Sequence, residues 1–315
     1  MHEYMEELIQ GLIFLARILL SIVVGSVKAM IPMGVLPRKD VRGQICLITG
    51  AGSGIGRLMA IEFARLGCTM VLWDVNTLGN EETKTMLANT GATVCVKLLS
   101  MVHTYTVDLS KREQINGTAE RVKREVGTVD ILINNAGVVT GKPLVDAPDE
   151  LIERTMAVNA SACLFTAKNF LPEMIERNHG HVVTIASVAG KMGAPKAVDY
   201  CASKFAAIGF HESLSAELRH IKDDGVKTTL VCPYLITTGM FDGVENKSPG
   251  LVSTLEPQYV VDCVLEAVLT NKEEVIIPKV LYGLAAQHFL PTETKHILIE
   301  YLGQYDAMDT FKGRT

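Results

Sequence analysis

The sequence DYCASKF places a tyrosine, Tyr200, four residues before a lysine, Lys204. On a helix, positions i and i+4 share a face, so the phenol and the ammonium group would point into the same space. A free tyrosine titrates near ~10 and is a poor base at neutral pH, but a neighbouring cation favours its phenolate and prepares it for proton transfer. Because the same spacing is common on solvated helix faces, its meaning depends on the rest of the chain.

A glycine-rich stretch, TGAGSGIG at residues 49–56, lies between an expected strand and an expected helix. Gly50 would permit a tight turn, Gly54 would let the backbone approach a pyrophosphate, and Gly56 would allow helix and strand to pack closely. The start of the helix would offer free N–H groups to the phosphates. The alternative is a glycine turn with a structural role only. We expect a dinucleotide to be contacted here by Gly50, Ser53, Gly54, Ile55 and Gly56.

Two aspartates stand at the ends of expected strands. Asp74 follows Gly56 by eighteen residues, where a carboxylate would hydrogen-bond the adenosine ribose and repel a 2′-phosphate. Ser53, directly before Gly54, adds no cation to offset that repulsion. This pattern favours NAD over NADP, although an aspartate that caps the next turn would look the same. Asp108 could accept a hydrogen bond from the adenine amino group or, alternatively, form a turn.

The elements that would position these residues alternate between strand and helix from about residue 41 onward. This alternation predicts a single α/β domain, a Rossmann-type doubly wound parallel sheet of about seven strands with helices on both faces. Several runs are apolar throughout, as expected for strands that are buried on both faces. The expected strands are residues 44–49, 69–74, 102–109, 129–134, 181–187, 227–233 and 273–278.

Two helical segments and one ambiguous stretch complete this pattern. A long helical region is expected over about 149–177, and the helix that carries Tyr200 is expected to end near Ile221. Between Gly91 and Asp108 the chain holds two strand-like runs, whereas one crossover needs a single strand. We take the second run as the strand and the first as an extension or insertion.

Five motifs resemble the short-chain dehydrogenase/reductase family in their order and spacing over about residues 41–280. They are TGAGSGIG, NNAG at 134–137, Asn159, Ser187 and YCASK at 200–204. More narrowly, VLWDVN, NNAGVV, DYCASKF and VCPYLITTGMF are similar to membrane-associated retinol dehydrogenases of the epidermal type and to their 17-beta-hydroxysteroid dehydrogenase relatives. The resemblance implies an NAD(P)-dependent oxidoreductase that interconverts a lipophilic alcohol and its carbonyl.

The substrate that this resemblance implies first is all-trans-retinol, oxidised to retinal, with a hydroxysteroid or another lipid alcohol as the alternative. A non-catalytic dinucleotide-binding protein of a membrane or lipid droplet is the competing hypothesis from another class. The intact set of Asn159, Ser187, Tyr200 and Lys204 argues against it.

The resemblance also implies a role for each of these residues. Tyr200 would be the general acid/base, and Lys204 would lower its pKa and hold the nicotinamide ribose. Ser187 would hydrogen-bond the substrate oxygen, and Asn159 would position a water that links Lys204 to solvent. The cofactor would further be contacted by Asn135, Ala136, Gly137, Pro233 and Thr238. From the sequence alone, a turn or helix cap explains Thr238 equally well.

One departure from the family concerns the residue after Pro233, where Pro-Gly is common and this chain has Tyr234. We expect Tyr234 to reshape the nicotinamide pocket without changing the class of reaction. Substrate contacts are expected from residues 138–148, 188–198 and 234–255, which include Met192, Met240 and Phe241.

Residues 8–24 form an apolar run that approaches the ~20 residues needed to span a bilayer, although Arg17 near its middle is costly. Carboxylates precede the run, and basic residues follow it at Lys28, Arg38, Lys39 and Arg42. This bias places the downstream domain on the cytosolic side. We expect a membrane anchor in the endoplasmic reticulum or on lipid droplets, as a span, a hairpin or an embedded helix. A buried N-terminal helix is the alternative.

The expected organisation is an anchor at 1–30, a linker at 31–40, the dehydrogenase domain at 41–280 and a C-terminal helical extension at 281–315. This extension is apolar enough to cover the substrate pocket, dock on another subunit or touch a membrane. A homo-oligomer is expected by resemblance only.

Charge and cysteine content exclude other classes of protein. The 315 residues carry a net charge of −5 and no basic block, which argues against a nucleic-acid partner. The seven cysteines show no metal-binding spacing. We therefore expect reduced thiols and no metal site.

Overall fold

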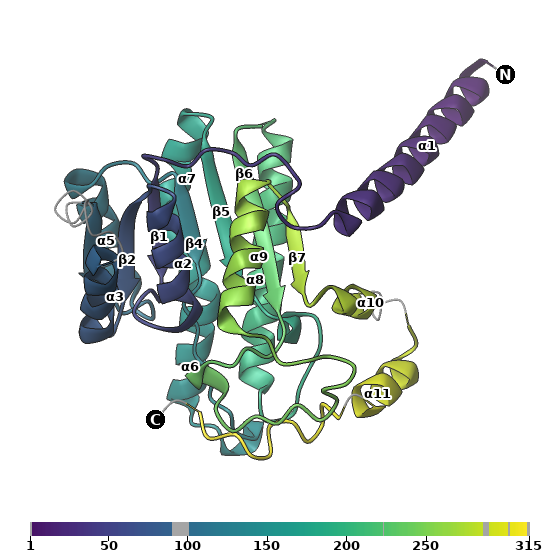
Figure 1. Cartoon of the computed structure of the whole chain (residues 1–315). Helices are drawn as coiled ribbons and strands as arrows, with labels where there is room; N and C mark the ends of the chain where they lie inside the picture. The colour runs from purple at the N-terminus through teal and green to yellow at the C-terminus, as the bar shows by residue number, and fades with distance from the viewer. Residues whose placement is uncertain (1, 90–100, 223, 286–289, 302, 314–315) are drawn as a thin grey trace. The chain divides into compact units, whose positions relative to one another are not determined.

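A computed structural model describes residues 2–89, 101–222, 224–285, 290–301 and 303–313 (Figure 1). By its internal contacts the chain divides into two compact units, Met1–Lys39 and Asp40–Thr315. The first unit holds helix α1 (His2–Met30), in which Tyr4–Gly25 has a mean hydropathy of 2.2 and no buried residue. This helix is long and apolar enough to cross a membrane.

The second unit is built on a parallel sheet of seven strands in the order β3-β2-β1-β4-β5-β6-β7. The strands are β1 (Ile45–Thr49), β2 (Thr69–Asp74), β3 (Val102–Thr106), β4 (Ile131–Asn134), β5 (Gly180–Ile185), β6 (Val226–Pro233) and β7 (Glu274–Ile277). The chain runs outward from β1 to β3 and then returns to place β4 beside β1. In open sheets of this kind, ligands bind at that switch point, outside the carboxyl ends of the strands.

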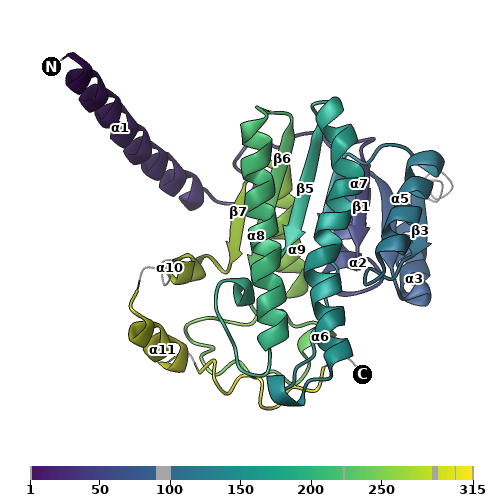
Figure 2. The same cartoon turned by 180° about the vertical axis from the view of Figure 1, so that it is seen from behind.

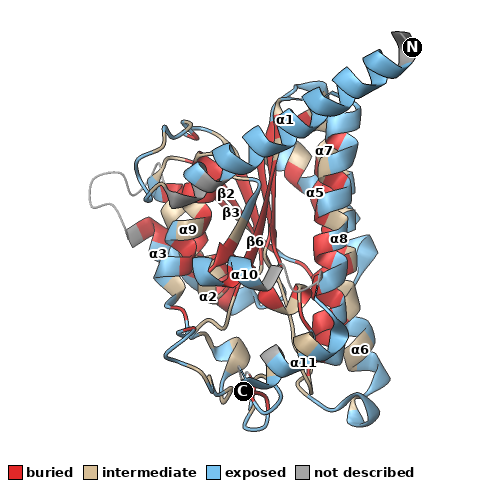
Figure 3. Ribbon diagram, turned by 90° about the vertical axis from the view of Figure 1, so that its right-hand side faces the viewer, coloured by how far each residue is buried: buried red, intermediate tan, exposed pale blue. Residues whose placement is uncertain are grey.

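Helices cover both faces of the sheet, so the strands between them are mostly buried (Figures 2 and 3). The helices of this unit are α2 (Gly54–Arg65), α3 (Thr77–Asn89), α5 (Arg112–Glu125), α6 (Asp149–Met156), α7 (Ala162–Glu176), α8 (Val198–His220), α9 (Pro257–Leu269), α10 (Tyr282–Ala285) and α11 (Thr292–Tyr301). Helices α2 and α9 lie on one face, and α5, α7 and α8 lie on the other (Figures 1 and 2).

A large apolar core lies on each face of the sheet, because side chains point to alternate faces along each strand. On β1, Cys46 and Ile48 join the core that contains residues of α2 and α9, whereas Leu47 joins the core that contains residues of α5 and α7. Strands packed on both sides in this way read in the sequence as continuous apolar runs. The predicted fold class, a doubly wound parallel α/β sheet with an apolar N-terminal helix, is therefore confirmed.

Two details of the sequence prediction need comment. The long helical region expected over 149–177 is confirmed, but it is not a single α-helix, because a π-helical turn, Ala157–Ser161, separates α6 from α7. Such turns insert a residue into the helix and re-aim the side chains around it. The second strand-like run of the ambiguous stretch forms β3 as predicted, and the first, at 92–99, lies outside the described residues.

Candidate active site

A cavity of about 530 Å³ opens at the carboxyl ends of the strands around the switch point. Its lining includes all the site residues named from the sequence except Asn159. Arg154 of α6 also lines it and was missed, because a single arginine on an amphipathic helix carries no distinctive sequence signal. The cavity therefore gathers site residues that lie up to 188 positions apart in the chain, from Gly50 to Thr238.

The glycine turn after β1 is shaped by close backbone contacts. Gly50 and Gly54 have φ angles of 69° and 56°, which side chains disfavour. A Cβ atom on Gly56 would lie 2.1 Å from the carbonyl oxygen of Gly50 and 2.6 Å from Nδ2 of Asn135. Asn135 in turn donates from Nδ2 to the carbonyl oxygen of Thr49 at 2.8 Å, so β4 holds this turn in place.

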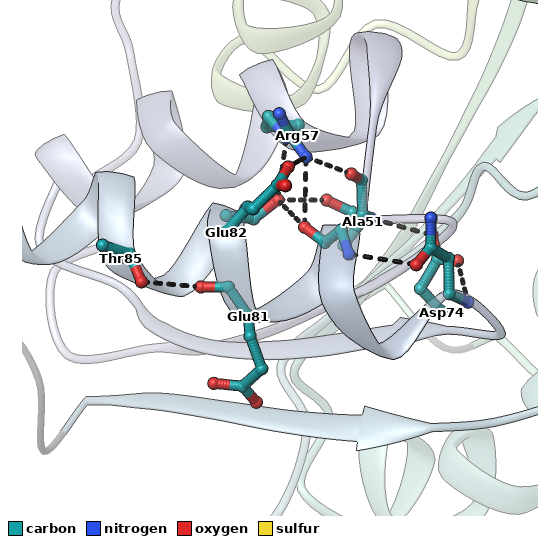
Figure 4. Close-up of polar contacts among 10 residues, drawn as sticks. Ala51, Arg57, Asp74, Glu81, Glu82 and Thr85 are labelled. Atoms are coloured by element: carbon teal, nitrogen blue, oxygen red, sulfur yellow. Dashed lines mark hydrogen bonds and ion pairs between the residues drawn. The ribbon is translucent and has the colours of Figure 1, made fainter.

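Asp74, at the end of β2, is joined to the same turn. Its Oδ2 accepts a hydrogen bond from the backbone N–H of Gly52 at 2.8 Å, and its Oδ1 accepts one from Asn76 at 2.8 Å (Figure 4). A Cβ atom on Gly52 would lie 2.9 Å from Oδ2 of Asp74. The carboxylate thus orders the turn and also lines the cavity, and its contact with a ribose stays a prediction.

Arg57, on helix α2 after the glycine turn, makes its contacts with residues outside the cavity lining or with backbone carbonyl groups. The Nη2 atom of Arg57 donates to the carbonyl oxygens of Gly52 and Gly79 and pairs with Glu82 at 2.9 Å, and its Nε donates to Thr83 (Figure 4). Arg57 is not among the cavity-lining residues. Arg57 therefore stabilises the glycine turn and does not place a positive charge in the cavity beside Asp74.

Asp108 forms the turn that was one alternative for it from the sequence, and its contact with an adenine amino group stays a prediction. It lines the cavity, and its Oδ1 accepts hydrogen bonds from the backbone N–H and the hydroxyl of Ser110 at 2.9 and 2.7 Å. Burial raises the pKa of this carboxyl, but the hydrogen bonds from Ser110 and the charges of Lys111 and Arg154 outweigh it, so the pKa is lowered overall. Asp108 therefore stays a hydrogen-bond acceptor at neutral pH.

Tyr200 and Lys204 lie on one face of α8, as the spacing predicts, and both are buried. The Tyr200 ring packs edge-on against Phe241, with 5.4 Å between ring centroids. The Nζ atom of Lys204 lies 5.7 Å from the Tyr200 ring centroid and donates to the carbonyl oxygen of Ile185 at 3.0 Å. The two side chains therefore share one small buried space between α8 and β5.

Burial dominates the electrostatics of this pair. Burial raises the pKa of Tyr200, and a hydrogen bond with Ser187 lowers it only in part. The pKa is raised overall because the phenolate loses more hydration than its neighbours replace. Lys204 is not among the causes of this shift, so its expected lowering of the Tyr200 pKa stays a prediction. Burial also lowers the pKa of Lys204.

Asn159 lies in the π-helical turn Ala157–Ser161, behind the cavity wall. Its Oδ1 accepts from the backbone N–H of Val138 at 2.8 Å, and its Nδ2 donates to the carbonyl oxygen of Val138 and to Oγ of Ser203, both at 2.9 Å. A Cβ atom on Gly137 would lie 3.5 Å from Oδ1 of Asn159 and 3.6 Å from Nζ of Lys204. The side chain thus ties the segment after β4 to α8 beside Lys204.

Ser187 and Thr238 stand at the ends of β5 and β6. Oγ of Ser187 accepts from the backbone N–H of Ala189 at 3.1 Å and lies 3.5 Å from the carbonyl oxygen of Pro233. Thr238 precedes the 3₁₀ turn Gly239–Phe241 without a side-chain cap. Its methyl group would be 3.9 Å from a Cβ atom on Gly54, so it faces the glycine turn across the cavity.

A second, smaller and mainly apolar cavity of about 100 Å³ adjoins the first. The two cavities share Ser187, Tyr200, Tyr234 and Phe241 in their linings. Met192 from the loop after β5 and Leu235 and Val244 from the loop after β6 line only the smaller one. Ser187 and Tyr200 therefore lie where the larger cavity, whose lining is both polar and apolar, meets the smaller apolar one.

The residues present fit a dinucleotide cofactor in the larger cavity. Glycines stand where a side chain would collide with the turn, a helix begins at Gly54, and a buried lysine lines the wall. Among the described residues there is no group of three or more histidine, cysteine or acidic side chains that could hold a metal ion. The arrangement suits transfer of a proton and a hydride, with the protein supplying the proton acceptor.

Comparison with known proteins agrees with this geometry. A family model of short-chain dehydrogenases matches residues 44–249. Human epidermal retinol dehydrogenase 2 is 50% identical over 300 residues, an alignment that covers 95% of this chain and 94% of the human protein. Rat retinol dehydrogenase 10 is 46% identical over 293 residues, covering 87% of this chain and 86% of its own.

Two solved structures have the same fold. A short-chain dehydrogenase/reductase from Burkholderia phymatum in complex with NAD has a TM-score of 0.69 at 27% identity, covering 82% of this chain and 96% of its own. A metagenomic short-chain oxidoreductase in complex with NADP has a TM-score of 0.61 at 28% identity, covering 76% of this chain and 98% of its own.

Proposed function

Because the chain belongs to the short-chain dehydrogenase family, we propose that it is an NAD-dependent oxidoreductase that interconverts all-trans-retinol and retinal. The observation that carries this proposal is the position of Ser187 and Tyr200 at the junction of a dinucleotide-sized cavity and an apolar one. A lipophilic alcohol in the apolar cavity would bring its hydroxyl group to these two residues. The names of relatives that are 50% and 46% identical support retinol as that alcohol.

Each side chain at the junction has a distinct task in this proposal. Ser187 donates a hydrogen bond to the substrate oxygen and orients it. Tyr200 removes the hydroxyl proton from the alcohol, and in the reverse direction it returns that proton to the carbonyl oxygen. When bound, a nicotinamide cofactor would supply the acceptor for the hydride that leaves the carbinol carbon. Burial of Tyr200 keeps bulk water away from the proton that it exchanges.

Lys204 and Asn159 support that proton transfer. Lys204 places a positive charge beside the Tyr200 ring, where it stabilises the phenolate that oxidation requires, and it holds the nicotinamide ribose. Asn159 fixes the backbone at Val138, which lines the cofactor cavity, and positions the water that connects Lys204 to solvent. Asn135, Ala136, Gly137, Pro233 and Thr238 complete the wall around the cofactor.

Preference for NAD over NADP rests on charge around the adenosine ribose. Asp74 presents a carboxylate there, Ser53 brings no positive charge, and Arg57 is bound to carbonyl groups and to Glu82. A 2′-phosphate would therefore meet a negative charge without a nearby free cation from this turn.

The substrate assignment is tested with full-length protein in detergent, supplied with all-trans-retinol or estradiol and with NAD or NADP. We expect kcat/KM to be highest for retinol with NAD. A higher kcat/KM for estradiol would transfer the assignment to a hydroxysteroid, and absence of turnover with every alcohol would leave the non-catalytic hypothesis. Sedimentation of the same preparation tests the homo-oligomer that we also propose, whose mass would be a multiple of one chain.

We further propose that α1 anchors the protein in the endoplasmic reticulum membrane or on lipid droplets, with the second unit in the cytosol. Residues 31–40 would be the linker, and the basic residues after the helix set this orientation. Carbonate extraction of membranes should retain the full-length chain, whereas a variant that starts at Lys39 should be released. Release of the full-length chain would contradict the anchor.

A further inference from the structure

The C-terminal segment Gly303–Gly313 contacts all three loops from which substrate contacts are expected. At the loop after β4, a Cβ atom on Gly141 would lie 1.9 Å from the Phe311 ring, so this ring rests on the glycine. At the loop after β5, Lys196 pairs with Asp309 at 2.6 Å. Figure 1 shows the segment after α11 crossing beneath the carboxyl ends of the strands to reach the C terminus beside α6.

The loop after β6 has the densest set of contacts with this segment. Nε2 of Gln304 donates to the hydroxyl oxygen of Tyr234 at 2.9 Å, and the backbone N–H of Glu245 donates to the carbonyl oxygen of Ala307 at 3.2 Å. The backbone N–H of Lys312 donates to the carbonyl oxygen of Asp242 at 2.9 Å. One short segment thus binds the loops of β4, β5 and β6 together.

Three residues of the segment face the apolar cavity beside Tyr200: Gln304, Ala307 and Met308. Met308 is 6% exposed and packs in the same apolar cluster as Tyr200 and Ala197, with Phe241 and Val244 against it. Met308, which lines this cavity, therefore packs in the same cluster as Tyr200, the proposed proton acceptor. These residues lie beyond 44–249, the part of the chain that the family model matches.

Because the apolar cavity is small, the residues that line it limit the size of the substrate that fits. At about 100 Å³ it is smaller than the roughly 300–1,000 Å³ of pockets that enclose drug-sized ligands. An alcohol of about five carbons can reach Tyr200 with little rearrangement, whereas a long polyene alcohol needs the wall to move. The volume and mobility of the Met308 side chain then limit the longer alcohol more than the shorter one.

We propose that Gln304, Ala307 and Met308 form the wall that decides which lipophilic alcohols reach Tyr200, with the Gln304–Tyr234 hydrogen bond holding that wall in place. The proposal rests on the proposed alcohol dehydrogenase function and adds the residues that set its substrate range. Of the three options that the apolar C-terminal residues left open, it selects the covering of the substrate pocket. It assigns substrate selectivity to residues that lie outside 44–249, the range that the family model matches.

The test compares all-trans-retinol with 3-methylbut-2-en-1-ol, which shares its allylic primary alcohol but not its length. Full-length protein in detergent is assayed with NAD as the wild type and as Met308→Trp and Met308→Ala. We expect Met308→Trp to lower kcat/KM for retinol at least tenfold and for the short alcohol less than threefold. Met308→Ala, which keeps the test valid if the tryptophan is not accommodated, should raise the retinol to short-alcohol ratio at least threefold. The KM for NAD should not change.

Ile297→Ala is the matched control, because this apolar residue of α11 is 65% exposed and lines neither cavity. Its substrate ratio should equal that of the wild type. A ratio within twofold of wild type in both Met308 variants would overturn the assignment of the wall while leaving the dehydrogenase function intact. A wild-type protein that oxidises neither alcohol would overturn both proposals.

Discussion

The Nζ atom of Lys204 lies 5.7 Å from the centroid of the Tyr200 ring, and both side chains are buried. A buried ammonium group is costly, and among the described residues its hydrogen-bond partner is the carbonyl oxygen of Ile185. A core position with only a structural task would be better filled by an apolar side chain. The burial of this pair beside the cavity is therefore consistent with the proposed chemistry, in which the lysine keeps a cation next to a phenol that loses and regains a proton.

Replacing Asp74 by asparagine should weaken the preference for NAD. The amide keeps an oxygen that can accept from the N–H of Gly52, so the turn stays ordered, but the charge that repels a 2′-phosphate is gone. We expect the ratio of kcat/KM with NAD to kcat/KM with NADP to fall at least tenfold. An unchanged ratio would mean that the charge of Asp74 does not discriminate between NAD and NADP.

Two glycine-to-alanine changes should act in opposite directions. In Gly56→Ala the new methyl group would meet the carbonyl oxygen of Gly50 at 2.1 Å, so we expect a loss of about 1–3 kcal/mol of unfolding free energy and at least tenfold weaker NAD binding. Gly117→Ala, in the interior of α5 with no atom within 4 Å of the added Cβ, should stabilise the protein by about 0.5–1 kcal/mol. Thermal unfolding and NADH fluorescence titration measure the two effects. Equal behaviour of the two variants would contradict the close approach at Gly56.

His211 should make the fold sensitive to mild acid. It is buried on α8 with Nδ1 2.9 Å from the hydroxyl of Thr184, and burial lowers its pKa to about 4. Between pH 6.5 and 4 the unfolded chain binds a proton at this residue and the folded chain does not, so stability falls as the pH falls. We expect the wild type to lose about 2 kcal/mol more than His211→Gln between pH 7 and 5, or about 4–8 °C in Tm. Parallel pH dependence of the two proteins would show that His211 is not the source.

The sheet and most of the site could be predicted from the sequence because their signals are local. Strands such as Thr69–Asp74 are buried on both sides and therefore appear as unbroken apolar runs. The glycine turn, the NNAG segment and the Tyr200–Lys204 pair are contiguous motifs, and the order of strands brings their ends to one edge of the sheet.

Other features depend on contacts that no local pattern records. The apolar periodicity continues through Ala157–Ser161, so the π-helical turn leaves little trace in the sequence. The hydrogen bond between Gln304 and Tyr234 joins residues 70 positions apart, and the apolar C-terminal extension was compatible with three different roles. The raised pKa of Tyr200 follows from its burial beneath Phe241 and Met308, which only the packed structure reveals.

The most direct test of the proposed chemistry is oxidation of all-trans-retinol with NAD by Tyr200→Phe. The change removes one hydroxyl group and keeps the ring that packs against Phe241, so Tm and the affinity for NADH should stay close to wild type. We predict that kcat/KM falls by roughly 10²–10⁴, the usual contribution of a positioned acid or base. A variant that binds NADH normally and oxidises retinol as fast as the wild type would contradict the assignment of Tyr200 as the proton acceptor.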